Sequence, residues 1–163
     1  MLFPAHSSIN KAFIKQVQTL YSAEEQIVSA LTGLDKEAFP PQLRNGLSFH
    51  LDQNIRQLSR VDQALAQLDR MPNDVVCTDI KRLIAEGKRL IEKSHNNPAV
   101  GSALISIARR VEEFEIMAYR ATIARAHELG LPAVASLLEN NLREEEFTSY
   151  RLAQVAEGML DVF

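Results

Sequence analysis

A row of apolar residues at helical spacing near the middle of the chain contains a glutamate at its centre. The row consists of Leu104, Ala108, Val111, Ala118, Thr122 and Ala126. Glu115 falls directly in this row, and Glu112 lies one turn earlier. Burying a carboxylate costs several kcal/mol unless a partner compensates its charge, so a buried Glu112-x-x-Glu115 step requires cations, a metal or protons in the core. The alternative is that both glutamates lie at the edge of the row and reach solvent.

The composition of the 163-residue chain favours a single all-α domain spanning residues 1–163. Six glycines, six prolines, no tryptophan and abundant Ala, Leu, Glu, Arg and Gln are typical of helices rather than sheets. A chain of this length buries an ordinary core without disulfides. Its one cysteine, Cys77, excludes an intramolecular disulfide and suits a reducing cytoplasm, where we expect the protein to reside.

Charge and hydropathy argue against several classes of partner. The net charge of −3 gives no strong field for nucleic acid or an anionic membrane. The N-terminal residues include a proline and polar side chains where a signal peptide needs an apolar core, and no apolar run is long enough to span a membrane. We therefore expect neither a nucleic-acid nor a membrane partner. The sequence also lacks the signatures of a phosphate loop, a structural zinc site and a nucleophile elbow.

Helical repeats and helix-breaking residues predict four long helices and one short one. The first is capped by Ser7 or Ser8 and ends near Gly33, and the second spans residues 41–69. A short helix follows over residues 76–91, then long helices over residues 98–128 and from Pro132 onward. The first two should be antiparallel neighbours because their connection is short. The expected fold is a four-helix bundle with an additional short helix in the crossover between long helices two and three.

The other long helices also carry polar residues at positions that should face the core. Glu24 lies between Leu20 and Ile27 in the row of the first helix, and Glu145 occupies a core position in the last. The second helix carries a polar cluster on one side: His50, Gln53, Asn54 and Gln57.

Acidic residues adjacent to these positions are expected at the surface. Glu25 points about 100° away from Glu24 on a helix. Glu144 and Glu146 flank Glu145, and we expect them to pair with Arg143 and Arg151.

Polar side chains from four facing helices that converge on one point are typical of di-iron and di-manganese bundle cores. Two divalent cations bring a charge of +4, which four carboxylates neutralise. Hard oxygen donors with at most one imidazole suit iron or manganese better than zinc. The sequence therefore predicts one or two iron or manganese ions, with candidate ligands Glu24, His50, Gln53, Glu112, Glu115 and Glu145.

Three motifs carry a resemblance to a known family. They are Tyr21-Ser-Ala-Glu-Glu-Gln26, Val111-Glu-Glu-Phe-Glu-Ile-Met-Ala-Tyr119 and Leu142-Arg-Glu-Glu145. The chain resembles the YciF/YciE-like bacterial stress proteins of the ferritin-like superfamily from about Phe13 to Leu152. The resemblance implies a ferritin-like bundle with a dinuclear metal centre, a homodimer and a role in stress responses. It assigns the ligand roles to Glu24, Glu112, Glu115 and Glu145.

The second helix departs from the family pattern, which resembles His-Leu-x-Glu-Thr-x-x-Gln. Here Gln53 replaces the expected glutamate. A glutamine keeps a carbonyl oxygen but loses the charge that bridges two metals, which puts the second metal position in doubt. Asp52 is a poor substitute because one residue rotates a helical side chain by about 100°. Glu113 replaces a histidine found in many relatives.

Two functions remain open. The first is a metal-binding stress protein in which His50, Gln53 and Gln57 act as weaker or outer groups around the glutamates. The second is a metal-free dimeric scaffold whose glutamates are protonated or paired within a polar core network. The expected homodimer rests on the family resemblance and on terminal apolar residues: Phe3, Leu160, Val162 and Phe163. Neither function establishes enzymatic turnover.

Overall fold

The computed structural model describes residues 10–34, 37, 39–94, 97 and 99–158. Within these residues the chain forms five helices: α1 (Lys11–Gly33), α2 (Pro41–Gln67), α3 (Thr78–Lys93), α4 (Val100–Glu128) and α5 (Pro132–Ala156). The all-α prediction is confirmed, and the short helix α3 lies between the second and third long helices as expected.

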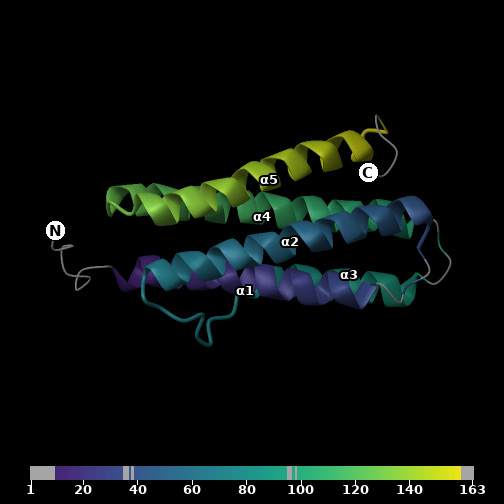
Figure 1. Cartoon of the computed structure of the whole chain (residues 1–163). Coiled ribbons are helices and arrows are strands. Elements are labelled where there is room, and N and C mark those ends of the chain that lie inside the picture. Colours follow the sequence, from purple (N-terminus) through teal and green to yellow (C-terminus); the bar gives the residue numbers. More distant parts are fainter. Residues whose placement is uncertain (1–9, 35–36, 38, 95–96, 98, 159–163) are drawn as a thin grey trace.

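The four long helices form two antiparallel pairs. Figure 1 shows α1 beside α2 and α4 beside α5, with α5 also packed along α2. α3 lies along the C-terminal half of α1 and packs against α4, so one half of the bundle has an additional wall. This arrangement confirms the ferritin-like four-helix bundle with a crossover helix.

The start of α1 differs from the sequence prediction. The side-chain oxygen of Asn10 accepts a hydrogen bond of 2.8 Å from the backbone N–H of Ala12, so Asn10 caps the helix. The predicted caps, Ser7 and Ser8, lie outside the described residues, as do the apolar residues Phe3, Leu160, Val162 and Phe163 and the predicted helix start at position 98.

Three long helices, α2, α4 and α5, are followed by a residue in the left-handed conformation, and after α2 and α4 this residue lets the chain turn back. After α4, Gly130 has φ of 68°, and the N–H of Leu131 donates to the carbonyl of Ala126 at 2.9 Å. After α2, Asp69 has φ of 53°, and the N–H of Arg70 donates to Leu65 at 3.0 Å. The end of α4 at Leu129-Gly130 is therefore as predicted.

A large apolar cluster fills the half of the bundle that α3 does not cover. Its buried residues come from all four long helices: Phe13, Val17, Leu20, Val61, Ala64, Leu65, Leu68, Tyr119, Ile123, Ala126, Val134, Ala135 and Leu138. The predicted row on α4 is partly wrong, because Tyr119 and Ile123 are buried whereas Val111 and Ala118 are only half-buried. Apolar residues occur on more than one side of α4, so helical spacing alone does not decide which row faces the core.

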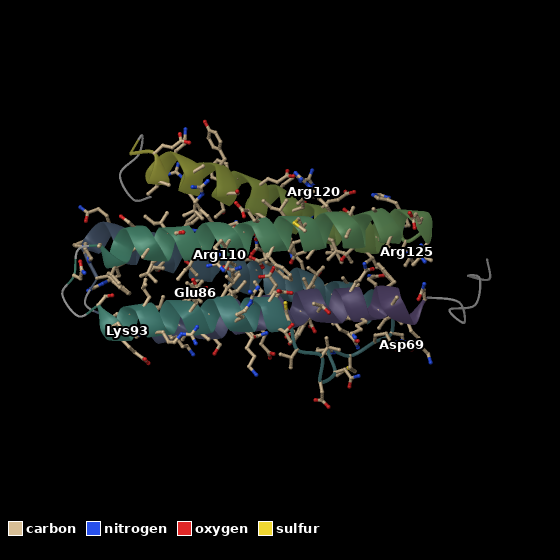
Figure 2. All side chains as sticks on the ribbon, turned by 180° about the vertical axis from the view of Figure 1, so that it is seen from behind. Asp69, Glu86, Lys93, Arg110, Arg120 and Arg125 are labelled. Carbon is tan, nitrogen blue, oxygen red and sulfur yellow. The ribbon has the colours of Figure 1, made fainter. Side chains whose placement is uncertain are left out.

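Ion pairs on the surface connect neighbouring helices. Arg110 of α4 and Glu86 of α3 lie 2.8 Å apart, and both are labelled in Figure 2. Arg120 of α4 pairs with Glu146 of α5 at 2.6 Å. Within the described ranges, no helix is long and apolar enough to cross a membrane.

The expected partners of the last-helix glutamates are wrong. Glu144 pairs with Arg60 of α2 at 2.9 Å, and Glu146 pairs with Arg120 rather than Arg151. Arg143 instead donates to Asn140 at 2.8 Å, and Arg151 lies over the ring of Phe147. Contacts between helices, which the sequence of one helix does not disclose, decide these pairings.

Hydrogen bonds from α1 hold the connection between α2 and α3. The hydroxyl oxygen of Ser22 accepts from the backbone N–H of Cys77 at 2.9 Å. Gln26 donates to the carbonyl of Cys77 at 3.1 Å, and Gln18 donates to the carbonyl of Met71 at 2.8 Å. These bonds fix the point at which α3 begins, beside the middle of α1.

We predict that Ser22→Ala destabilises the protein by about 1–3 kcal/mol, because it leaves the buried N–H of Cys77 without its acceptor. Thr19→Ala is the matched control, since its exposed hydroxyl bonds only to Lys15 in its own helix. Urea denaturation of the two variants measures the difference. Equal losses of unfolding free energy would contradict this role of Ser22.

Candidate metal centre

Three buried glutamates from three helices converge at the centre of the bundle. Glu24 of α1, Glu115 of α4 and Glu145 of α5 each offer a carboxylate oxygen, and these oxygens lie within 4.8 Å of one another. Their side chains are 0%, 1% and 2% exposed. The sequence prediction that these three carboxylates meet in the core therefore agrees with the structure.

Glu112 lies beside this group and is also buried. It forms a hydrogen bond with Glu145 that raises the pKa of Glu112 and opposes the rise that burial causes in the pKa of Glu145. Glu112 Oε2 and Glu115 Oε1 are buried and have no hydrogen-bond partner among the described residues. Such atoms have the capacity to bind a further group.

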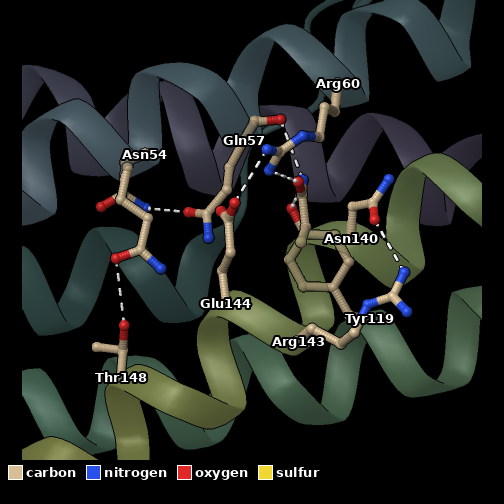
Figure 3. Close-up of polar contacts among 10 residues, drawn as sticks. Asn54, Gln57, Arg60, Tyr119, Asn140, Arg143, Glu144 and Thr148 are labelled. Carbon is tan, nitrogen blue, oxygen red and sulfur yellow. Dashed lines mark hydrogen bonds and ion pairs between the residues drawn. The ribbon is translucent and has the colours of Figure 1, made fainter.

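A chain of polar side chains holds Glu24 in place. The hydroxyl of Tyr119 donates to Glu24 Oε1, and the amide of Asn54 donates to Glu24 Oε2 at 3.0 Å. Asn141 donates to the hydroxyl oxygen of Tyr119 at 2.9 Å and accepts from Arg60 at 2.9 Å (Figure 3). Both oxygens of Glu24 are thereby oriented by side chains from α2 and α4.

The second helix contributes amides rather than a carboxylate to this centre. Gln53 is buried, and its carbonyl oxygen accepts from the hydroxyl of Thr148 at 3.2 Å (Figure 3). Gln57 is fully buried, and its side-chain carbonyl oxygen accepts from Asn54 at 2.9 Å. Asp52 is exposed, as the helical rotation predicts.

His50 lies on α2 one turn before Asn54, outside the group of three converging carboxylates. Burial lowers its pKa to about 4, so its imidazole is neutral near pH 7 and brings no positive charge to the glutamates. Of the other predicted ligands, Glu112 hydrogen-bonds to Glu145, His50 lines the same cavity as Glu112 and Glu115, and Gln53 contacts Thr148 of α5.

Burial raises the pKa of all four core glutamates. For Glu24 the pKa rises to about 8, first because burial removes solvent and second because Glu145 repels a negative charge. Burial and the neighbouring Glu145 also raise the pKa of Glu112 and Glu115. Burial likewise raises the pKa of Tyr119, which keeps its hydroxyl protonated as a donor to Glu24.

Among the ion pairs found within the described residues, none involves the four core glutamates. Arg60 approaches from the surface, but it pairs with Glu144 and Asn141. Protons or a bound metal must therefore compensate the charge of these carboxylates. The alternative that the side chains of Glu112 and Glu115 reach solvent is wrong, because both are buried.

Sequence reasoning missed three residues that complete the centre: Tyr119, Asn54 and Asn141. Tyr119 stands in the third-helix motif but was given no role. Asn54 was placed in the polar cluster of the second helix without a partner. Asn141 precedes Glu145 by four residues, so helical spacing puts both on one face of the last helix, and the structure shows that Asn141 is fully buried.

Comparison with known proteins places the chain among bacterial bundles of the same fold. The profile of a family described as a domain of unknown function, DUF892, matches residues 8–162. Protein YciF of Escherichia coli K12 is 31% identical over 150 residues, which cover 91% of this chain and 90% of YciF.

Solved structures give the same result. The crystal structure of the E. coli stress protein YciF superposes with a TM-score of 0.83 at 30% identity, over 92% of this chain and 95% of that one. YcfI of Rhodopseudomonas palustris, whose description proposes a structural role, superposes with a TM-score of 0.81 at 30% identity over 93% and 98%. A protein of Xanthomonas campestris pv. campestris, 19% identical with a TM-score of 0.72 over 91% of both chains, shares the fold.

We predict that chelator-treated protein loses stability as pH rises. The pKa of Glu24 is about 8 in the folded protein against an ordinary value of 4.5. Its contribution to the stability of the fold is therefore fully present below the unfolded pKa and is lost as pH rises through about 8. One such group lowers the unfolding free energy by about 1.4 kcal/mol per pH unit between the two pKa values.

Urea denaturation across this range measures the slope. Glu24→Gln should reduce it, whereas Glu25→Gln, an exposed neighbour, should leave it unchanged. A stability that rises with pH would contradict the protonated state of the buried glutamates.

Proposed function

Because this chain belongs to the DUF892 family, which matches residues 8–162, we propose that it is a ferritin-like bacterial stress-response protein that binds iron or manganese in its core. The stress role is carried over from the relative described as the E. coli stress protein YciF, which is 30% identical over 92% of this chain. The metal role rests on the chain's own carboxylates.

The observation that carries the metal proposal is the meeting of Glu24, Glu115 and Glu145, whose oxygens lie within 4.8 Å of one another in a buried position. Three carboxylates at this distance repel one another unless protons or a cation compensate them. Carboxylate oxygens without sulfur or a bound imidazole are the donors that hard divalent cations prefer, and iron and manganese accept them in bundle cores.

The residues present fit a metal at this position. Glu24, Glu115 and Glu145 would hold it, and the unpartnered oxygens Glu112 Oε2 and Glu115 Oε1 would serve as further donors. Gln53 occupies the position of the family's second-helix glutamate, and its carbonyl oxygen accepts from Thr148. We therefore expect one firmly held ion and a second position with weaker affinity, because Gln53 supplies no negative charge.

When bound, iron or manganese supplies electron-transfer chemistry, and the surrounding residues control its ligands. Tyr119 and Asn54 fix the orientation of Glu24 through their hydrogen bonds. Outer groups of this kind tune the affinity for metal and the basicity of the ligands. The fold and the ligands do not by themselves define a reaction or a substrate.

We further propose that the protein acts as a cytoplasmic homodimer. Support comes from the family resemblance and from several large apolar side chains that are exposed in this chain: Phe49, Ile55, Met71, Val76, Met117, Phe147 and Tyr150. Storage of iron in bulk is not part of the proposal, because a dimer of small bundles encloses no cavity for a mineral.

A second function, a metal-free dimeric scaffold, is favoured by one observation. The hydrogen bonds among Asn54, Glu24, Tyr119 and Asn141 already satisfy several buried polar groups, as a structural polar core requires. In that case protons alone compensate the glutamates, and Gln53 reflects a metal site that has been lost.

We predict that Glu115→Ala abolishes Mn(II) binding while the metal-free variant stays folded. Glu115 is one of the three converging ligands, and its removal also relieves repulsion from Glu145 and Glu24. Wild type should gain about 2.7 kcal/mol of stability at a metal concentration one hundred times Kd, and the variant should gain none. Titration calorimetry and melting temperatures with and without Mn(II) measure both effects.

Glu113→Ala is the matched control, because Glu113 is exposed on the same helix. The metal proposal fails if Glu115→Ala binds Mn(II) as tightly as wild type, or if Glu113→Ala loses binding equally.

We predict that Gln53→Glu increases the number of ions bound, because it restores a negative ligand on α2. The affinity should rise with pH as the core carboxylates lose protons. Gln63→Glu, an exposed change on the same helix, is the control. Equilibrium dialysis of both variants with Fe(II) or Mn(II) gives the stoichiometry, and equal values would contradict the role assigned to position 53.

A further inference from the structure

A cavity of about 350 Å³ extends from the core glutamates along the half of the bundle that α3 covers. At its inner end it is lined by Glu112 and Glu115 of α4 and Asn54 of α2. At its outer end it is lined by Gly33, Leu34 and residues of α3 near the C-terminus of that helix. Its volume falls in the range of sites that bind small organic molecules.

The walls of this cavity are apolar. They are formed by aliphatic side chains of three helices: Ile27, Leu31, Leu83, Ile84, Leu104 and Ile107. The lining residues of α4 extend from Leu104 to Glu115, about 16 Å of helix at 1.5 Å per residue. The space is thus long enough for an extended aliphatic chain. It does not suit a hydrated ion, because the ion would lose its water against apolar walls.

The two ends of the cavity differ in character. At the inner end, Glu112 Oε2 and Glu115 Oε1 are buried without a hydrogen-bond partner among the described residues. Near the outer end, Lys88 and Glu92 are exposed, so this end opens to solvent. A molecule that enters from the open end therefore meets apolar walls first and unsatisfied oxygens last.

We propose that this cavity binds an uncharged aliphatic molecule of medium chain length that carries one hydroxyl-type group, with this group directed at Glu112 and Glu115. A hydroxyl both donates and accepts, so it satisfies a carboxyl oxygen in either protonation state. A charged end group would lose its hydration at the apolar walls, which costs far more than for a hydroxyl. The proposal goes beyond the metal function and does not require that a metal be bound.

Gly87 of α3 offers a direct way to fill the cavity. It is buried and lines the space, and a Cβ added to it would lie 3.9 Å from Ile107 Cδ1, an ordinary contact. A larger side chain at this position would extend toward α4 and occupy volume that the aliphatic chain needs. Gly101 of α4 does not line the cavity, and a Cβ there meets nothing within 4 Å.

The test measures binding of 1-decanol to the full chain by titration calorimetry and by the shift in melting temperature, before and after chelator treatment. We expect one molecule per chelated chain, weaker binding once a metal occupies the oxygens of Glu112 and Glu115, and weaker binding of decanoate and decylamine than of decanol. Gly87→Leu should weaken the binding of decanol about tenfold or more, and Gly101→Leu should leave it unchanged. Ala108→Leu, which fills the cavity from α4, should act like Gly87→Leu, so the result does not depend on one variant folding correctly.

Three results would overturn the proposal. They are no saturable binding of decanol to wild type, equal binding to the Gly87→Leu and Gly101→Leu variants, or tighter binding of the charged probes. Because chelated protein is tested directly, failure of the metal proposal leaves this result interpretable.

Discussion

The structure depends on how the charge of four buried glutamates is compensated. Glu24, Glu112, Glu115 and Glu145 lie within a helical core, and among the ion pairs of the described residues none reaches them. Burial raises the pKa of each, which favours the protonated form in the absence of a cation. A metal achieves the same compensation while using oxygens that otherwise lack partners.

The rest of the bundle is organised on either side of this polar layer. On one side, Phe13, Val61 and Leu138 belong to a large cluster of buried apolar side chains, whose burial stabilises the fold. On the other side, α3 adds a wall and the core opens into a cavity that ends at Glu112 and Glu115. A well-packed half thus holds the glutamates in place, and a hollow half gives access to them.

The sequence predicted the five helices and the inward direction of Glu24, Glu115 and Glu145, because helical spacing and breaking residues depend on local chemistry. It did not predict the bonds of Tyr119 and Asn141, because these arise between helices far apart in the chain. It also paired Glu144 and Glu146 with the wrong arginines for the same reason. The cavity beside α3 depends on the spacing between helices, which periodicity in one helix does not report.

The central claim is that the core glutamates bind a metal, and elemental analysis of protein purified without added metal tests it most directly. The convergence of Glu24, Glu115 and Glu145 within 4.8 Å predicts about one iron or manganese ion per chain, with a second position only partly filled. A metal content near zero, together with a melting temperature that Fe(II) and Mn(II) leave unchanged, would contradict the claim and leave a bundle whose polar core is held by protons.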